Sequence, residues 1–233
     1  VEHHQLNDKI MKKTLSVLCA ACALVMATSC DKDNPREDPT GGVEAVDLGL
    51  SVKWASWNVG AKCEADYGSY FAWGETSGKD YYDWSTYKWA EYISSWSMTK
   101  YNKSDRLTIL EASDDPATVN WGSKWHTPTK SDIEQLRSES LCEWKWETKK
   151  DALGNDVNGY TVTSKVPGFE GKSIFLPAAG YRNLEIISSV GDRGDYWSSE
   201  VDDVPYSLNF NSSFPSISRH FRSHGLSVRA VQD

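Results

Sequence analysis

The sequence predicts an α+β fold with short, mostly antiparallel strands, one or two helices and long irregular loops. Three observations lead to this prediction. Several short stretches alternate apolar and polar residues with the period of two that is typical of a half-buried strand. Residues 127–139 carry the start signals of a helix. Residues 76–120 are polar, aromatic and rich in turn-forming types, with weak periodicity.

Composition favours one globular domain with processing segments attached. The 233 residues are 39% hydrophobic and 25% charged, and 11 Trp and 11 Tyr supply large apolar surfaces for a core. The formal net charge is −8. The only adjacent basic pairs are Lys12–Lys13 and Lys149–Lys150, so the sequence argues against nucleic acid as a partner.

The first 29 residues predict an upstream extension followed by a signal peptide. Met11 and two lysines precede an apolar run at 14–27, which is too short for a membrane-spanning helix. The run ends in Ala27-Thr28-Ser29-Cys30, which resembles a relaxed bacterial lipobox. We therefore expect lipidation of Cys30, which makes the chain an outer-membrane lipoprotein on the cell surface. The alternative is ordinary signal cleavage, in which Cys30 has no role.

A flexible tether is predicted for residues 30–43, because this stretch has two prolines, paired glycines, mixed charge and little apolar surface. The acidic residues directly after Cys30 also resemble the export signal of surface-displayed lipoproteins. The folded domain is then expected to cover residues 44–233.

Within that domain the expected elements follow in order. Apolar residues alternate from Leu48 to Trp54, and residues 67–75 resemble a second, aromatic strand. Thr129 and Asp132 form a predicted capping box at the start of the helix. Further strands are predicted at 159–164, 173–180, 196–200, 206–210 and 225–231.

Seven motifs spread over residues 46–231 resemble the Fibrobacter-type major paralogous domain. They are VDLGLSVKWASWNVGA, DYGSYFAWGET, WGSKWHTPTKSDIEQL, NGYTV, SIFLPAAGYR, YWSSE and GLSVRAV. The resemblance implies a C-type-lectin-like fold in a bacterial surface lipoprotein. Trp57 departs from the family pattern, because many members have Cys there, and His126-Thr127 replace the usual Arg and aliphatic residue.

The C-terminal stretch 201–231 contains no Lys, Glu, Gln, Met or Trp. These types make up 48 of the 233 residues, so a stretch of this length with average composition would hold about six. The domain is also similar to the variable proteins of diversity-generating retroelements. Such elements rewrite adenines in codons that end in a pyrimidine, and these codons cannot encode the five missing types. The resemblance thus implies a diversified C-terminal face, whereas the alternative is an ordinary polar hairpin.

The predicted ligand-binding residues are polar or exposed aromatic positions that interrupt the inward alternation of this stretch. They are Asp202, Asp203, Pro205, Phe214, Ser216, Ser218, His220, Phe221 and His224. A buried frame is expected beneath them, formed by Trp197, Leu208, Phe210, Leu226 and Val228. The alternation also places Tyr206 inside and Ser207, Asn209 and Asn211 outside. The expected partner is a protein or glycan on cells, phage or host surfaces. A binding module of the same fold without diversification is the alternative.

No metal, cofactor or catalytic site is expected. His126, His220 and His224 have no Cys or carboxylate at metal-ligand spacing, and a pair at 220 and 224 would need a helix to converge. The pairs Asp114–Asp115 and Asp202–Asp203 are interpreted as solvated loop acids rather than calcium ligands.

An enzymatic function is not favoured either. Residues 125–136 also resemble the helix start of formylglycine-generating enzymes, but those enzymes use a C-terminal cysteine pair and the last cysteine here is Cys142. Cys63 and Cys142 are the two thiols after Cys30. Whether they form a disulfide stays open at this point.

Overall fold

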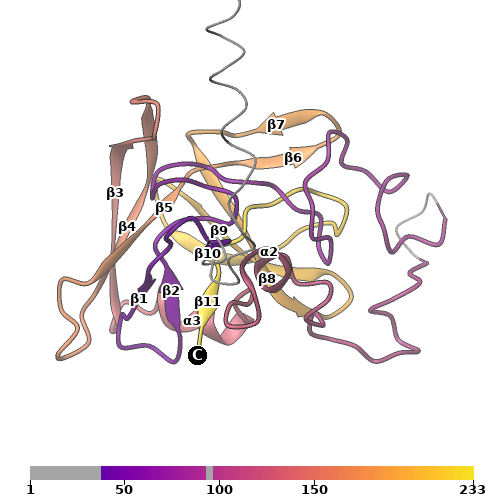
Figure 1. Cartoon of the computed structure of the whole chain (residues 1–233), viewed down its shortest axis with the longest axis horizontal. Coiled ribbons are helices and arrows are strands. Elements are labelled where there is room, and N and C mark those ends of the chain that lie inside the picture. Colours follow the sequence, from indigo (N-terminus) through magenta and orange to yellow (C-terminus); the bar gives the residue numbers. More distant parts are fainter. Residues whose placement is uncertain (1–37, 93–96) are drawn as a thin grey trace, which may run out of the picture. The chain divides into compact units, whose positions relative to one another are not determined.

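Three small antiparallel sheets and one hairpin form the scaffold of the domain (Figure 1). The computed structural model describes residues 38–92 and 97–233, and these described residues belong to one compact unit. The α+β architecture with short antiparallel strands and two helices is as predicted. The predictions for the signal peptide, for Cys30 and for tether residues 30–37 lie outside the described residues.

The first sheet joins the two ends of the domain. β1 (Ala45–Val46) and β11 (Val231–Gln232) pair on either side of β2 (Lys53–Ala55). Burial alternates from Leu48 to Trp54 as expected, but only the last part of that stretch is a strand. The preceding residues bend, and Gly49 has a positive φ of 72° there.

The second sheet contains two strands of nine residues each. The hairpin of β3 (Cys142–Lys150) and β4 (Asp156–Ser164) extends at one side of Figure 1, with β5 (Ser173–Pro177) paired to β4. Two short strands, β6 (Tyr181–Asn183) and β7 (Ile186–Ser188), follow as a separate hairpin.

The third sheet has the order β10–β9–β8, with β8 at Arg193–Val201, β9 at Pro205–Asn211 and β10 at Pro215–Arg219. Gly194 in β8 is required by packing, because an added Cβ would lie 2.1 Å from the Phe210 ring of the neighbouring strand. The missing side chain therefore lets the ring lie directly against the β8 backbone.

Both helices are fixed by side-chain caps. The predicted helix is α3 (Lys130–Arg137), and its capping box of Thr129 and Asp132 is present. The other helix, α2 (Pro116–Trp121), was not predicted. Its N-cap is Asp115, which is buried together with Asp114, so the prediction that these two are solvated loop acids is wrong. Asp114 is held by Tyr101 and by the ammonium groups of Lys88 and Lys100.

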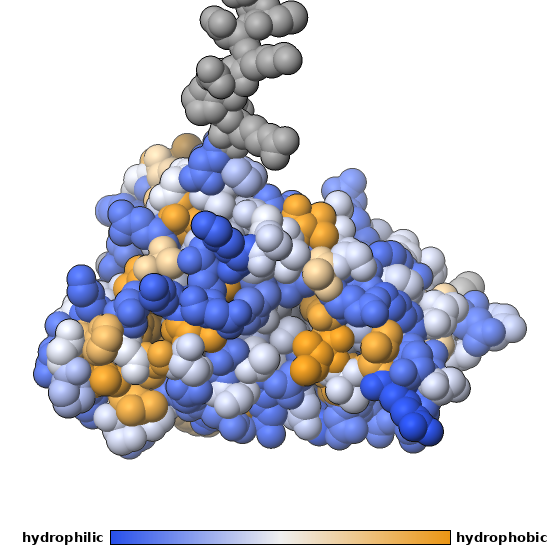
Figure 2. All heavy atoms as spheres, turned by 60° about the horizontal axis from the view of Figure 1, so that its bottom comes forward, coloured by the Kyte–Doolittle hydropathy of each residue, from blue (hydrophilic) through white to orange (hydrophobic). Residues whose placement is uncertain are grey.

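Two apolar clusters lie on the opposite sides of the β10–β9–β8 sheet. Tyr196 belongs to the cluster shared with β3–β5 and α3, whereas its neighbour Trp197 belongs to the cluster that contains Trp73 and Val228. The five frame residues predicted from the sequence, Trp197, Leu208, Phe210, Leu226 and Val228, are all buried. On the molecular surface, polar residues cover most of the face in Figure 2 and apolar ones form small separate groups.

Two stretches predicted as strands are irregular. Residues 67–75 and 225–230 contact each other through the isolated bridge between Phe71 and Leu226, and their other backbone hydrogen bonds go to separate segments, such as those from Val59 N to Val228 O and from Trp73 N to Arg222 O. Their aromatic and alternating composition reflects burial, since most of these side chains are enclosed. Burial alone does not require a regular ladder, which is why the pattern was misleading.

Candidate functional site

The register of the β10–β9–β8 sheet separates its side chains into an apolar and a polar face. Tyr196, Leu208 and Ile217 are register partners and pack into the first cluster. The opposite side, which we call the polar face, has charged and polar side chains in the same register, except that Trp197 packs into the second apolar cluster. Its members are Arg193, Asp195 and Trp197 on β8, Ser207, Asn209 and Asn211 on β9, and Ser216 and Ser218 on β10.

A buried carboxylate organises the polar face. Asp195 is fully buried, and its Oδ1 accepts hydrogen bonds from Arg193 Nη2 and Asn209 Nδ2, both at 2.8 Å, and lies 2.9 Å from His220 Nε2. Arg193 Nε lies 2.8 Å from Asp195 Oδ2, as an ion pair whose N–H is not aligned for a hydrogen bond. Such partners are necessary because a buried charge without them is strongly unfavourable.

Two histidines lie close together next to this carboxylate, although the segment that carries them is not a helix. His220 and His224 flank a turn closed by the bond from His224 N to Phe221 O, and their Nδ1 atoms are 3.5 Å apart. The ring of Tyr181, from β6, lies 5.3 and 5.5 Å from the two imidazole centroids. Burial, followed by the nearby His220, lowers the pKa of His224 to about 4, so its imidazole is neutral at pH 7.

An aromatic border continues from these histidines to the molecular surface. Phe221 is 55% exposed, and its ring is edge-on to His224 at 5.4 Å and to Trp84 at 6.3 Å. Exposed rings next to short polar side chains are typical of adaptable binding surfaces, because rings supply contact area and hydroxyls or amides supply hydrogen bonds. The polar face and this border can therefore bind a ligand surface without any covalent chemistry.

Five of the nine predicted ligand-binding residues come together here. Ser216 and Ser218 lie on the polar face, and His220, Phe221 and His224 lie directly beside it. His220 is only 9% exposed, because its ring turns inward to Asp195. It is thus a support beneath the surface, and the expectation of an exposed side chain is wrong.

The other four residues lie elsewhere. Asp202 and Asp203 are exposed in the β8–β9 turn, whereas Phe214 is 62% exposed in the β9–β10 turn, at the opposite end of strand β9. Pro205 is buried, since it starts β9 opposite Val201. The structure therefore does not unite all nine positions in one site.

Two alternation predictions within β9 are also wrong. Ser207 is fully buried, because it lies opposite Trp197, which packs into the second cluster. Its Oγ has no hydrogen-bond partner among the described residues. Tyr206 is half-buried rather than internal, and its ring lies beneath the cations of Arg219 and Lys130 at 4.6 and 4.9 Å.

Sequence reasoning missed Arg193, Asp195, Tyr181 and Trp84, all of which precede the stretch 201–231. A signal was present for the first two. Arg193 and Asp195 occupy alternate positions just before the predicted strand at 196–200, and side chains two apart in a strand share a face. Tyr181 and Trp84 reach the site only through tertiary packing, so no local pattern could have identified them.

The described residues provide little for metal or thiol chemistry. Within 38–92 and 97–233, no three His, Cys, Asp or Glu side chains are grouped as metal ligands. Cys63 and Cys142 are free thiols, which resolves the open question of a disulfide. Burial raises the pKa of Cys63, and it raises that of Cys142 to about 11, so neither is an activated nucleophile.

Two further findings bear on identity and location. No family model, curated protein or solved structure matches this chain. Over the part of the chain that the structure describes, no helix has the length and apolar character needed to cross a membrane.

Proposed function

We propose that this chain is a surface-anchored, ligand-binding lipoprotein with a C-type-lectin-like fold. The polar face and its aromatic border bind the ligand, which is a protein or glycan carried by cells, phage or host surfaces. The ligand-contacting side chains are diversified by a retroelement, whereas the residues beneath them are constant.

One observation carries this proposal. The stretch 201–231, which lacks the five residue types, supplies β9, β10 and the turn at 220–224. These are the parts that present side chains at the polar face. Arg193 and Asp195, which hold the face together, precede the stretch. Two of the three supporting residues, Arg193 and Asp195, therefore precede the compositional boundary, whereas the strands that present exchangeable side chains follow it. The third supporting residue, His220, lies inside the stretch.

The strand geometry supports the same division. Because side chains alternate across a strand, Ser216 and Ser218 can be exchanged while Ile217 between them still packs into the first cluster. Exposed substitutions change stability by only about ±0.5 kcal/mol, whereas truncated core residues cost about 2–5 kcal/mol. A diversified surface on this frame is thus compatible with a constant fold.

The direct test exchanges presented residues and measures folding and binding separately. One variant combines Asn211→Ser, Ser216→Asn, Ser218→Asn and Phe221→Tyr, and each new residue can be encoded by a codon that ends in a pyrimidine. The control variant combines Lys145→Ser, Lys150→Ser and Leu153→Asn, which are exposed positions in the β3–β4 hairpin.

Both variants should melt within about 3 °C of the parent chain. Only the first should change which cells or glycans of a panel are bound. An unchanged binding profile in the first variant would refute the proposed site, and a collapse of its melting transition would show that these residues are structural.

The anchor and the diversification have their own tests. Labelling with a palmitate analogue should mark the parent chain and not Cys30→Ala. The genome next to the coding region should contain a near-copy of the last ~100 bases that differs at adenines, together with a reverse transcriptase gene (about three bases for each residue of 201–231). Equal labelling of both chains, or the lack of such a copy, would contradict the corresponding part of the proposal.

A further inference from the structure

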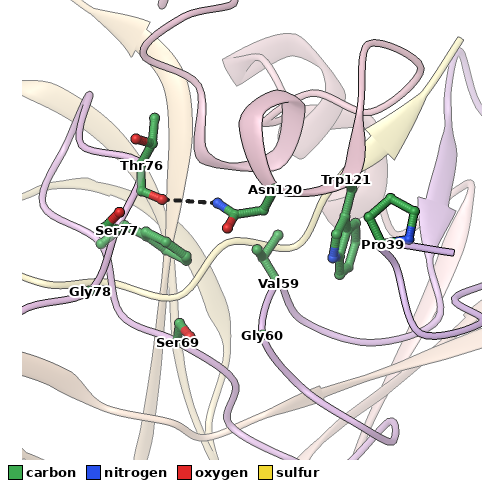
Figure 3. A pocket seen from close by; sticks show the side chains of 10 residues that line it. Pro39, Val59, Gly60, Ser69, Thr76, Ser77, Gly78, Asn120 and Trp121 are labelled. Carbon is green, nitrogen blue, oxygen red and sulfur yellow. Dashed lines mark hydrogen bonds between the residues drawn. The ribbon is translucent and has the colours of Figure 1, made fainter. Parts of the chain in front are cut away.

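The surface also contains a pocket that shares no residue with the polar face. It has a volume of about 340 Å³, at the lower end of the range of small-ligand pockets. In Figure 3, Asn120 extends from α2 toward Thr76, with Ser69 and Ser77 on that side and Trp121 on the other. The hollow is therefore large enough for one small molecule or one unit of a larger one.

The lining of this pocket carries no formal charge. Its walls consist of glycine, hydroxyl, amide, aliphatic and aromatic groups, and no Asp, Glu, Lys, Arg or His is among them. Phosphates, carboxylates and cations are bound in proteins by charged partners or by convergent backbone groups. A neutral ligand fits this lining better than an ion.

The amide of Asn120 is held in one orientation. Its Nδ2 donates to the carbonyl oxygens of Thr76 at 2.9 Å and Pro116 at 2.7 Å. Since both neighbours are acceptors, the nitrogen must be the atom that faces them. Oδ1 is left as a fixed acceptor for a donor on the ligand.

Three hydroxyls on the same side add adaptable polar groups. The side chains of Ser69, Thr76 and Ser77 make no hydrogen bond to other described residues. Each can donate and accept. Pro39, Val59 and the small exposed parts of Phe71 and Trp121 provide the apolar part of the wall. Polar groups beside aromatic surface match a ring whose edge carries hydroxyls and whose faces carry C–H groups.

The wall that includes α2 is rigid. Asp115 Oδ1 accepts from Ala117 N and Thr127 Oγ1, and its Oδ2 accepts from Thr127 N, each at 2.8 Å. Trp121 packs edge-on against Trp125 with the ring centroids 5.3 Å apart. A site that is already ordered loses less entropy on binding.

From this arrangement we propose that the pocket is a second binding site, specific for a neutral sugar residue. Asn120 Oδ1 accepts from one ligand hydroxyl, the three side-chain hydroxyls bond to others, and the ring C–H groups lie against Phe71 or Trp121. This inference is independent of the proposed function of the polar face.

The test uses the methyl glycosides of glucose, galactose, mannose and N-acetylglucosamine as probes with the full chain. Saturation-transfer NMR should detect saturable binding of at least one of them. Ser77→Tyr, which fills the hollow, should abolish this binding. Asn120→Ala should weaken it about five- to tenfold through the loss of the fixed acceptor.

Ser140→Tyr is the matched control, because it adds the same side chain at an exposed position of the turn between α3 and β3, outside the stretch 201–231. It should leave sugar binding unchanged, and melting curves of all variants should match the parent curve. The proposal is overturned if no glycoside binds saturably, or if Ser77→Tyr and Asn120→Ala melt normally and bind as the parent chain does. Neither outcome affects the proposal for the polar face, which is measured through different variants.

Discussion

Arg229 and Asp195 are two of the buried charged side chains of this domain, and they are stabilised by different kinds of partner. Arg229 is 1% exposed and has only neutral partners: its guanidinium donates to Asn58 Oδ1 and to the carbonyl oxygens of Ala55, Ser56 and Phe175, over 2.7–3.1 Å. Burial lowers its pKa to about 10, so it still carries a charge at pH 7. It joins the C-terminal segment to β2, β5 and the loop after β2.

Asp195 is equally buried, but its partners lead to the surface. Arg193 has a third of its side chain exposed, and His220 contacts the half-buried His224. The two networks therefore differ in what they hold in place. Arg229, which is bonded only to internal oxygen atoms, joins separate parts of the fold, whereas Asp195, whose network reaches the surface, supports the polar face.

The largest expected effect comes from removing the internal charge. Arg229→Met leaves four acceptors without their donor in a region closed to water, which should lower the free energy of unfolding by about 3–5 kcal/mol. Urea denaturation measures this change. Arg219→Met is the control, because the exposed Arg219 pairs with Asp202 and with the hydroxyl and ring of Tyr206 in solvent, and it should cost less than about 1 kcal/mol. Equal effects of the two variants would contradict the structural role of Arg229.

Asp195→Asn should have a smaller effect on stability and a larger one on the site. The amide keeps the shape but removes the charge that holds Arg193 and His220, so we expect a loss of about 2–3 kcal/mol. The imidazole NMR signals of His220 and His224 should also shift. Asp202→Asn, at an exposed ion pair, should change stability by less than about 0.5 kcal/mol and leave those signals in place. Unshifted imidazole signals in Asp195→Asn would exclude the proposed support.

The same contrast explains how far sequence reasoning could go. α3 was predictable, because its capping box and the inward residues Ile133 and Leu136 all lie within one short segment. The alternation in β9 identified Leu208 and Phe210 as buried for the same reason. Local chemistry decides these features, so the sequence contains the information.

The site depended on distant contacts and was only partly predictable. Pro205 was assigned to the surface, but it is buried where it pairs with Val201. His220 was also assigned to the surface, but its ring is turned inward and lies against the carboxylate of Asp195, 25 positions earlier in the chain. The burial of Arg229 depends on carbonyl groups of residues 55, 56 and 175, which no local pattern associates with it. Tertiary packing determines such positions, and a single sequence does not display it.

Acid should destabilise the surface-linked network before the internal one. The pKa of His224 is lowered to about 4 in the folded state, against about 6.5 when unfolded. Between these values the unfolded chain binds more protons, so stability is highest above about pH 6.5 and declines toward pH 4. Partial exposure of His224 limits the loss to the order of 1–2 kcal/mol.

Urea midpoints measured from pH 7 to pH 4 test this expectation. His224→Gln should flatten the decline, because the group that takes up the proton in the unfolded chain is gone. His126→Gln is the control, because His126 pairs with Val231 of β11 and its side chain contacts Asp233 rather than the Asp195 network. An equally steep decline in His224→Gln and the parent chain would show that other groups cause it.

The smallest expected effect concerns three successive positions of β10, of which the outer two lie on one face and the middle one lies on the other. Ser216→Asn with Ser218→Asn changes only the polar face, so the free energy of unfolding should stay within about ±0.5 kcal/mol of the parent value. Ile217→Asn places an amide against the first cluster instead, and it should cost about 2 kcal/mol through lost apolar burial and an unsatisfied polar group. Urea denaturation of both variants compares the two faces directly. If the double serine variant were as destabilised as Ile217→Asn, strand β10 would have no exchangeable face, and ligand binding would have to be sought elsewhere on the domain.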